Sequence, residues 1–318
     1  MISDVYIFGY QSMLAEGSLA TSIGGRDVPE DYVPALLAGY VRDWSAVRDF
    51  SHNPRKRYVR TGDWRPAGRV AFATLAAHPN GMVNGVCHRV SADRLDELDF
   101  REHGYIRVAV DAALGAYPGH HLAAGLPSFA YIDPHPDPVP TLVSRAYYDM
   151  GRLGAAAIDA RAPGFAADYL AFTRPPSVLA DDLSFVFFSG DGRHLWLLNE
   201  ADSSLVLLLA FTQPQFEAQV DSVPEAHRPV TVGLEWLDAR RRGAAPIATP
   251  IVASPRIPAA MADELLHAEG GRLATSPYWL CRLAATQVAP PDALLATLAA
   301  DPDPWVRRAA VLRRGITP

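Results

Sequence analysis

The sequence predicts an α+β protein, and three observations support that class. Short runs rich in β-branched and aromatic residues dominate the first 135 residues. Segments with helical periodicity follow these runs rather than alternating with them, which is typical of α+β proteins. The composition is that of a folded chain, because 49% of the 318 residues are apolar and 20% are charged.

Six strands are expected in the first region. They are Val5–Gly9, Ala35–Val47, Val70–Ala76, Val83–Val90, Tyr105–Val110 and Pro127–Ile132. After the fourth run, Ser91 is placed to cap a short helix that carries Leu95 and Leu98 three positions apart.

Two helices are expected after these strands. The first begins after Ser144, because small and apolar positions repeat there with the period of a helix. Those positions are Tyr147, Met150, Gly151, Gly154 and Ile158. The second helix spans Phe165–Phe172 and must end before Pro175–Pro176, since proline cannot continue a helix. The proline pair is the first predicted domain boundary.

The middle of the chain has a different residue pattern, in which apolar strands are joined by turns of Gly, Asp and Ser. The expected strands are Ser184–Phe188, His194–Asn199 and Ser204–Thr212, with a fourth across residues 229–237. Residues 246–258 contain several prolines and are interpreted as a linker.

A weak internal repeat marks the tail. Trp279–Ala285 is echoed 26 positions later by Trp305–Val311, and a helix is expected between them at Asp292–Ala300. Short helices at such a period normally stack into a solenoid. The pattern resembles leucine-rich-repeat-variant and HEAT arrays. The predicted domains are therefore residues 1–174, a β-rich segment with its linker at 175–258, and a helical-repeat-like tail at 259–318.

Charge and composition exclude several classes of protein. The net charge of −6 gives no general attraction to nucleic acid or to an anionic membrane. Cys87 and Cys281 share no zinc-ligand spacing, and His120, His121 and His135 lack the spacing of a metal site. No signal peptide or membrane-spanning run is visible. We therefore expect a soluble, cytoplasmic protein that binds no metal, nucleic acid or membrane.

One basic segment has the residue types of a nucleic-acid-binding surface. Arg55, Lys56 and Arg57 stand beside Tyr58 and Arg60. In a chain that is acidic as a whole, such a run more often forms a solvated loop than a nucleic-acid site. We expect a solvated loop here.

Two passages of the first region carry recognisable motifs. The first is Tyr6–Leu14, with the sequence YIFGYQSML, a strand that runs into a loop. The second begins with Val83–Val86 (VNGV) and continues at Leu95–Tyr105 (LDELDFREHGY). Together they resemble the γ-glutamylcyclotransferase-like superfamily. Lesser matches lie at Gly39–Trp44, Ala130–Tyr131 and Ser144–Tyr148, so the resemblance covers about residues 4–174.

The resemblance implies a small mixed β-barrel flanked by helices and a cofactor-free enzyme of the acyltransferase or lyase type. The implied reaction releases 5-oxoproline from a γ-glutamyl amine or peptide. Glu102 falls at the family's catalytic position. Gly9, Tyr10, Gln11, Ser12, Met13 and Tyr105 fall where the substrate is bound.

The residues themselves are compatible with this chemistry. The α-amine of a γ-glutamyl group attacks its own γ-carbonyl, so no protein nucleophile is needed. One partly desolvated carboxylate with a raised pKa, Glu102, suffices to move the proton. A structural role is also open, because Glu102 is placed to pair with Arg101 or Arg107. Tyr10 and Tyr105 suit the core as well as substrate contact, and Ser12 suits a turn.

Gln11 departs from the family pattern, which has glycine at this position. Glycine permits a positive φ and a close approach of the backbone to a ligand, and glutamine disfavours both. Two hypotheses follow. In the first, the chain is an active γ-glutamyl cyclotransferase with a small γ-glutamyl substrate. In the second, it is a catalytically altered or inactive binding or adaptor protein that meets a protein partner through residues 259–318.

Overall fold

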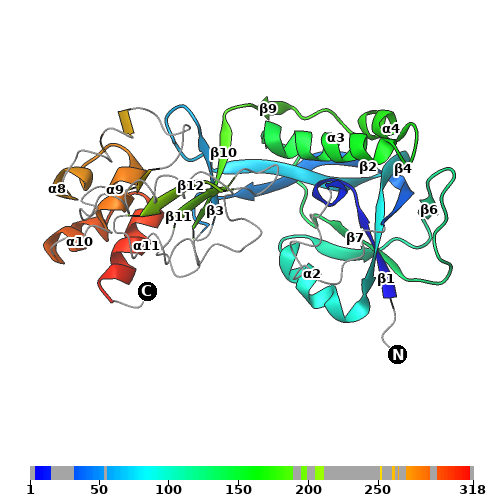
Figure 1. Cartoon of the computed structure of the whole chain (residues 1–318), viewed down its shortest axis with the longest axis horizontal. Helices are drawn as coiled ribbons and strands as arrows, with labels where there is room; N and C mark the ends of the chain where they lie inside the picture. The colour runs from blue at the N-terminus through cyan, green and yellow to red at the C-terminus, as the bar shows by residue number, and fades with distance from the viewer. Residues whose placement is uncertain are drawn as a thin grey trace, which may run out of the picture. The chain divides into compact units, whose positions relative to one another are not determined.

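The computed structural model divides the chain into two units (Figure 1). It describes residues 4–15, 32–53, 56–188, 195–198, 205–210, 251–252, 260–261, 264, 270–286 and 292–315. Unit 1 contains residues 1–48 and 69–181, and unit 2 contains residues 49–68 and 182–318. The chain therefore leaves unit 1 after Arg48, contributes one short segment to unit 2, and returns.

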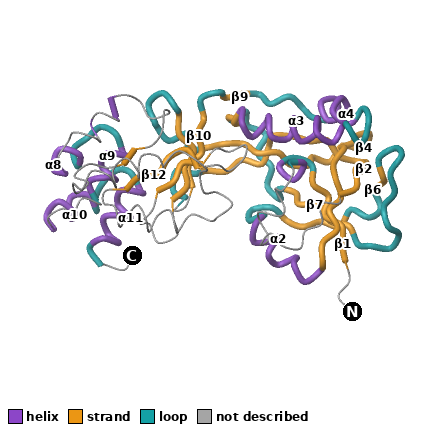
Figure 2. The backbone as a smooth tube through the Cα atoms, viewed as in Figure 1, coloured by secondary structure: helices purple, strands orange, loops and turns teal. Residues whose placement is uncertain are grey.

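Unit 1 is built on a mixed sheet (Figure 2). Its strands are β1 (Asp4–Gly9), β2 (Tyr32–Asp49), β4 (Arg69–Ser91), β5 (Ile106–Ala109), β6 (Leu114–Ala116), β7 (Ser128–Ile132), β8 (Leu142–Ser144) and β9 (Val178–Ala180). The main order is β5-β7-β1-β4-β2-β6, and β8 joins β4 to β9. β1 pairs antiparallel with β4 and parallel with β7. The predicted α+β class is confirmed, with a strongly curled, half-barrel sheet.

One predicted break in this sheet is wrong. The pattern predicts two strands at Val70–Ala76 and Val83–Val90, whereas both belong to β4, a single strand of 23 residues. The intervening Gly81 serves a close approach rather than a turn. A Cβ added to Gly81 would lie 2.3 Å from the carbonyl oxygen of Tyr40 in β2, so a side chain has no room there.

The helices of unit 1 are α2 (Leu95–Arg101), α3 (Arg145–Asp159) and α4 (Phe165–Ala171). α3 and α4 pack against each other, as Figure 1 shows. α3 begins after Ser144 as predicted, and the Ser144 side chain caps it by accepting a hydrogen bond from the Tyr147 N–H at 3.4 Å. Ser91 precedes the short 3₁₀ turn that leads into α2, but its side chain makes no capping hydrogen bond.

Unit 2 has a five-stranded sheet in the order β13-β12-β11-β10-β3. Its strands are β3 (Lys56–Arg60), β10 (Leu183–Phe188), β11 (Leu195–Leu198), β12 (Leu205–Ala210) and β13 (Ile251–Val252). β10, β11 and β12 confirm the three predicted strands. The expected strand at 229–237 lies outside the described residues, and so does the predicted linker except for β13.

The expectation of a solvated basic loop is wrong for Arg57, whereas Lys56 lies in a strand but is exposed to solvent as expected. Both belong to β3, which pairs antiparallel with β10. The Arg57 side chain is only 1% exposed. The sequence hides this strand because its partner, β10, begins more than 120 residues later in the chain. Arg55 lies outside the described residues.

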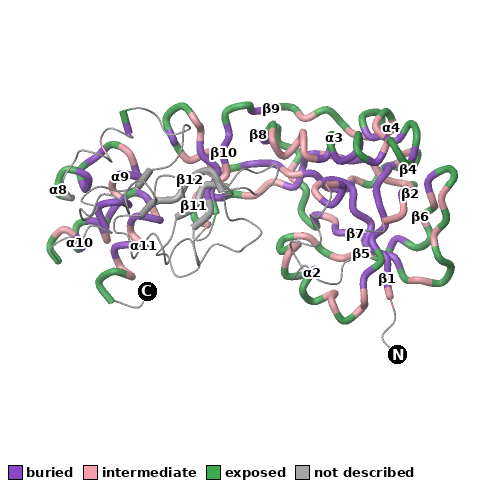
Figure 3. Tube along the Cα trace, viewed as in Figure 1, coloured by how far each residue is buried: buried purple, intermediate pink, exposed green. Residues whose placement is uncertain are grey.

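The helices of unit 2 are α8 (Gly270–Leu273), α9 (Trp279–Ala285), α10 (Asp292–Leu298) and α11 (Pro304–Arg313). Buried residues line α9 and α11 (Figure 3). The guanidinium of Arg57 lies over the rings of Trp279 and Trp305, at 4.6 and 4.2 Å from their centroids. It also donates to the carboxylate of Asp303 at 2.8 Å. A charged residue thus sits in the core of unit 2, paired and stacked.

Residues 49–68 are an integral part of unit 2. The Trp279 Nε1–H donates to the carbonyl of Trp64 at 2.7 Å, and the Trp305 Nε1–H donates to that of Asn53 at 2.7 Å. The sequence pattern assigns this segment to the first domain. The predicted boundaries after residues 174 and 258 remain predictions. Among the described residues, no helix is long and apolar enough to cross a membrane.

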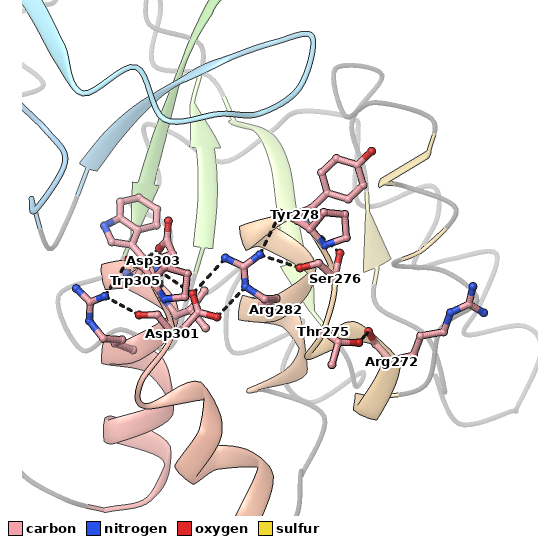
Figure 4. A network of polar contacts seen from close by, with 12 residues as sticks. Arg272, Thr275, Ser276, Tyr278, Arg282, Asp301, Asp303 and Trp305 are labelled. Atoms are coloured by element: carbon pink, nitrogen blue, oxygen red, sulfur yellow. Dashed lines mark hydrogen bonds and ion pairs between the residues drawn. The ribbon is translucent and has the colours of Figure 1, made fainter.

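α9 and α11 begin with the same local contacts, 25 positions apart (Figure 4). Ahead of α9, the Ser276 hydroxyl oxygen accepts from the Tyr278 N–H at 3.1 Å. Ahead of α11, the Asp301 carboxylate accepts from the Asp303 N–H at 2.7 Å. In both places a side chain binds the N–H two residues later and forms a turn just before the helix.

An arginine repeats at the same offset. Arg282 donates to the carbonyls six and five positions before it, at 2.8 and 3.0 Å. Arg307 does the same, at 2.5 and 2.9 Å. Arg282 also pairs with Asp301 at 2.7 Å and so ties the two helix starts together (Figure 4). The local contacts therefore recur every 25 positions, one fewer than the tryptophan echo predicts.

Candidate functional site

The loop after β1 and the turn after α2 line one hollow in unit 1. All seven residues predicted for the site lie on its wall: Gly9, Tyr10, Gln11, Ser12, Met13, Glu102 and Tyr105. Phe8, Ala73, Tyr131 and Tyr147 complete the lining. The centre of a water-sized molecule can move within about 30 Å³ of this hollow, so its inner part is narrow.

Two buried side chains hold the backbone of the loop from behind. The Arg42 Nε–H donates to the carbonyl of Tyr10 at 2.7 Å. The His88 Nε2 lies 3.0 Å from the carbonyl of Met13. Because a carbonyl only accepts, His88 must carry its proton on Nε2. Burial lowers the pKa of His88 to about 4, so at neutral pH the ring is uncharged and this hydrogen bond is kept.

Arg42 also places a positive charge behind the loop. Its guanidinium is fully buried and donates to the carbonyls of Asn84 and Tyr169 at 2.6 and 3.2 Å. It lies 4.0 Å from the centroid of the Tyr169 ring. Burial lowers its pKa to about 10, so the group stays charged at neutral pH. All its hydrogen-bond acceptors among the described residues are neutral, which leaves its charge uncompensated by a carboxylate.

The carbonyl groups of this loop are hydrogen-bonded within the fold, whereas its N–H groups have no partner among the described residues. The carbonyls of Gln11 and Ser12 accept from the N–H groups of Leu14 and Ala15, at 3.0 and 3.2 Å. Within the described residues, no hydrogen bond uses the backbone N–H groups of residues 10–13. Successive unpaired N–H groups beside a hollow form a cradle that suits an anion.

Gln11 is part of the scaffold of this loop. Its backbone φ is −142°, so the position does not need the positive φ that favours glycine. Its amide nitrogen donates to the carbonyl of Tyr147 at 2.8 Å, and its amide oxygen accepts from the Tyr169 hydroxyl at 2.5 Å. The side chain occupies space left by Gly151, where an added Cβ would lie 2.3 Å from the Gln11 Oε1 atom.

Replacing Gln11 by glycine should destabilise the protein. The Gln11→Gly variant removes the acceptor of the Tyr169 hydroxyl and the second hydrogen bond of the Tyr147 carbonyl, and it opens a void beside Gly151. We expect a loss of about 2–4 kcal/mol in the free energy of unfolding, measured by denaturant titration. A Gln11→Gly protein as stable as the wild type would contradict this role.

Glu102 ends helix α2, where its N–H donates to the carbonyl of Leu98 at 2.8 Å. Its side chain is 17% exposed, and its Oε1 atom lies 3.0 Å from the Nη1 atom of Arg101. The structure thus shows the ion pair with Arg101 that the sequence left open. Arg107 instead pairs with Asp99 at 3.3 Å. Glu102 is partly desolvated and faces the hollow.

Three tyrosines, Tyr10, Tyr105 and Tyr147, line the hollow together with Glu102. The hydroxyl of Tyr10 donates to the carbonyl of Tyr131 at 2.6 Å, and that of Tyr105 donates to the carbonyl of Ala73 at 3.0 Å. Burial raises the pKa of Tyr10, Tyr105 and Tyr147, and the nearby Glu102 carboxylate raises each of them further. All three hydroxyls therefore stay protonated at neutral pH and remain donors.

Tyr147 also lines the hollow, but it is not among the residues predicted for the site. Its backbone carbonyl holds Gln11, whereas its hydroxyl makes no hydrogen bond with a described residue. The signal for it was present in the sequence. Tyr147 stands three positions after Ser144 in one of the weaker motif matches, and the helical periodicity places it among the apolar and small positions of that helix.

The described residues contain no group of three or more His, Cys, Asp or Glu side chains arranged to hold a metal ion. His88 lies next to the hollow but binds the loop backbone. Cys87 and Cys281 are both buried, and burial raises the pKa of each thiol to about 12. Neither thiol is therefore an activated nucleophile.

No family model and no curated protein matches the chain. Among solved structures, a gamma-glutamyl cyclotransferase is similar with a TM-score of 0.38 and 16% identity, over 54% of this chain and 90% of that one. A gamma-glutamyl cyclotransferase specific to glutathione from yeast gives 0.30 and 13%, over 54% and 98%. YkqA from Bacillus subtilis gives 0.33 and 18%, over 48% and 49%. At such scores, the function has to be argued from the site.

Proposed function

We propose that the chain is a γ-glutamyl cyclotransferase-type enzyme that releases 5-oxoproline from a γ-glutamyl amine or peptide. One observation carries this assignment: Glu102 lines the same hollow as residues 10–13, whose backbone N–H groups have no partner among the described residues. The first is a proton acceptor, and the second are donors for an anion. The reaction needs both.

The substrate supplies its own nucleophile. The α-amine attacks the γ-carbonyl carbon, the bond to the departing amine breaks, and a five-membered lactam forms. Glu102 accepts a proton from the attacking ammonium group and returns it to the leaving amine. Because the attack is intramolecular, orientation within a narrow hollow contributes much of the rate.

The loop and the tyrosines would bind the rest of the γ-glutamyl group. The N–H groups of residues 10–13 suit its α-carboxylate, and the buried charge of Arg42 behind them favours an anion there. The hydroxyl of Tyr147, which has no hydrogen-bond partner among the described residues, suits a second polar atom of the substrate. No metal or cofactor is part of this mechanism. We also expect the protein to act in the cytoplasm.

One observation favours a second candidate function. The Glu102 carboxylate is paired with Arg101 at 3.0 Å, and this ion pair competes with a contact between Glu102 and the ammonium group of a substrate. A chain that has lost turnover would act as a γ-glutamyl-binding or adaptor protein. In that case residues 259–318 would supply the surface for a protein partner.

A turnover assay separates the two. The purified chain is incubated with a γ-glutamyl dipeptide, glutathione and ε-(γ-glutamyl)lysine, and 5-oxoproline is quantified. We expect release from at least one of the three, undiminished by EDTA. Binding of these compounds without release would favour the second candidate. Neither binding nor release would reject both.

A further inference from the structure

Arg48 lies close to the site, although it belongs to none of the sequence motifs and does not line the hollow. It lies near the end of β2 and is the last residue of unit 1 before the chain enters unit 2. Its Nη1–H donates to the carboxylate of Asp133 at 2.6 Å, and its Nη2–H donates to the carbonyl of Gly104 at 2.7 Å. Its guanidinium carbon lies 4.9 Å from the centroid of the Tyr105 ring.

The segment that Arg48 holds is the turn that carries Glu102. This turn is closed by the Tyr105 N–H, which donates to the carbonyl of Glu102 at 2.8 Å. Gly104 has a φ of +98°, and an added Cβ there would lie 3.0 Å from the Nε atom of Arg48. The turn and the guanidinium therefore fit closely, and glycine is required between them.

Arg48 is itself anchored to the sheet. Its partner Asp133 follows directly after β7, and the Asp133 side chain is 2% exposed. The Asp133 N–H donates to the hydroxyl of Thr74 in β4 at 2.9 Å, and the other carboxylate oxygen accepts from the His135 N–H at 2.8 Å. The planar guanidinium thus connects a fixed carboxylate to the turn that follows the seven-residue helix α2.

We propose that Arg48 is a positioning residue for Glu102, and this inference rests on the proposed function. Helix ends fray unless their terminal groups are bound. Glu102 occupies such an end, and its carboxylate must meet a proton of a substrate bound at residues 10–13. Arg48 fixes the turn on the far side of Glu102 through the Gly104 carbonyl and the Tyr105 ring. It touches neither the hollow nor the loop that would bind the substrate.

This arrangement predicts that Arg48 affects the chemical step rather than substrate binding. In the Arg48→Met variant we expect kcat for 5-oxoproline release to fall about 10- to 100-fold, because a displacement of about 1 Å in a catalytic group can cost that much. KM should stay within about twofold, since the loop is untouched. Arg69→Met is the matched control. It breaks another arginine–aspartate pair of unit 1, with Asp137, away from the turn, and should leave both constants unchanged.

Hydrogen exchange provides a readout that does not depend on activity. The amide of Tyr105 should exchange faster in Arg48→Met than in the wild type or in Arg69→Met. If Arg48→Met does not fold, Arg48→Lys serves instead. Lysine keeps the charge but cannot span Asp133 and Gly104 together, so we expect a smaller loss of kcat and a smaller rise in exchange.

The outcomes are distinct. Faster exchange at Tyr105 with a lower kcat and an unchanged KM supports the inference. Unchanged exchange, or an unchanged kcat despite faster exchange, overturns it. If the wild type releases no 5-oxoproline from any γ-glutamyl compound, the proposed function fails. The contribution of Arg48 to the turn is then decided by the exchange of the Tyr105 amide alone.

Discussion

The Glu102→Gln variant should release 5-oxoproline at least about 100-fold more slowly than the wild type. Glutamine keeps the shape of the side chain but cannot accept the proton of the attacking ammonium group. The variant should fold normally, since Glu102 is 17% exposed and its backbone hydrogen bond to Leu98 is unaffected. Its affinity for 5-oxoproline should change little, because the N–H groups of residues 10–13 remain. Steady-state kinetics and a binding titration measure the two effects.

Glu97→Gln is the control for this experiment. Glu97 lies on the same helix, is 51% exposed, and pairs with Arg94 at 2.8 Å. Its replacement removes the same charge from α2 without touching the hollow, so turnover should stay within about twofold of the wild type. Equal turnover by Glu102→Gln and Glu97→Gln would contradict the assignment of Glu102 as the residue that carries the proton.

The second large effect is expected in unit 2. Asp303→Asn should lower the free energy of unfolding by about 3–5 kcal/mol, because it leaves the buried guanidinium of Arg57 without a counter-charge. Asparagine caps a helix as well as aspartate does. The hydrogen bond from the Trp305 N–H, at 2.9 Å, is therefore kept, and the substitution isolates the ion pair. Denaturant unfolding followed by tryptophan fluorescence reports on it, since Trp279 and Trp305 flank Arg57.

Asp292→Asn is the matched control for this variant. Asp292 begins α10 and is exposed, and no ion pair joins it to another described residue. We expect its unfolding free energy to stay within about 0.5 kcal/mol of the wild type. A loss below 1 kcal/mol for Asp303→Asn would show that Arg57 does not depend on this pair.

Local patterns in the sequence predicted the elements that are stabilised locally. The helical period after Ser144 and the proline pair at 175–176 correctly placed α3 and α4. The failures concern partners that are distant in the chain. β3 forms because β10 pairs with it, and β4 runs through Gly81 because β2 lies against that glycine. No window of neighbouring residues contains those contacts.

The candidate site shows the same division. The residues predicted from motifs line one hollow, because the motif residues come from the two loops that border it. The residues that hold these two loops in place could not be predicted from the sequence. Arg42 and Arg48 both lie on β2, and each acts on a loop more than 30 residues away in sequence through carbonyl groups. An arginine that binds a carbonyl leaves no spacing pattern in the sequence.

Gln11 shows why a departure from a family pattern needs the structure for its interpretation. The sequence offered backbone strain or an altered pocket as explanations. The structure shows a negative φ and an amide that bridges two helices through Tyr147 and Tyr169. Space for that amide comes from Gly151, 140 positions later. The substitution and the space that accommodates it have to be considered together.

Chemical-shift mapping with L-5-oxoproline tests the central claim most directly, because it needs neither turnover nor a known leaving group. In ¹⁵N-labelled protein, the product should shift the backbone amides of residues 10–13 and of Tyr105. These residues line the hollow, and the N–H groups of residues 10–13 have no partner among the described residues. The Glu102→Gln variant should show the same set of shifts. Saturating L-5-oxoproline that leaves the amides of residues 10–13 unmoved would contradict the account.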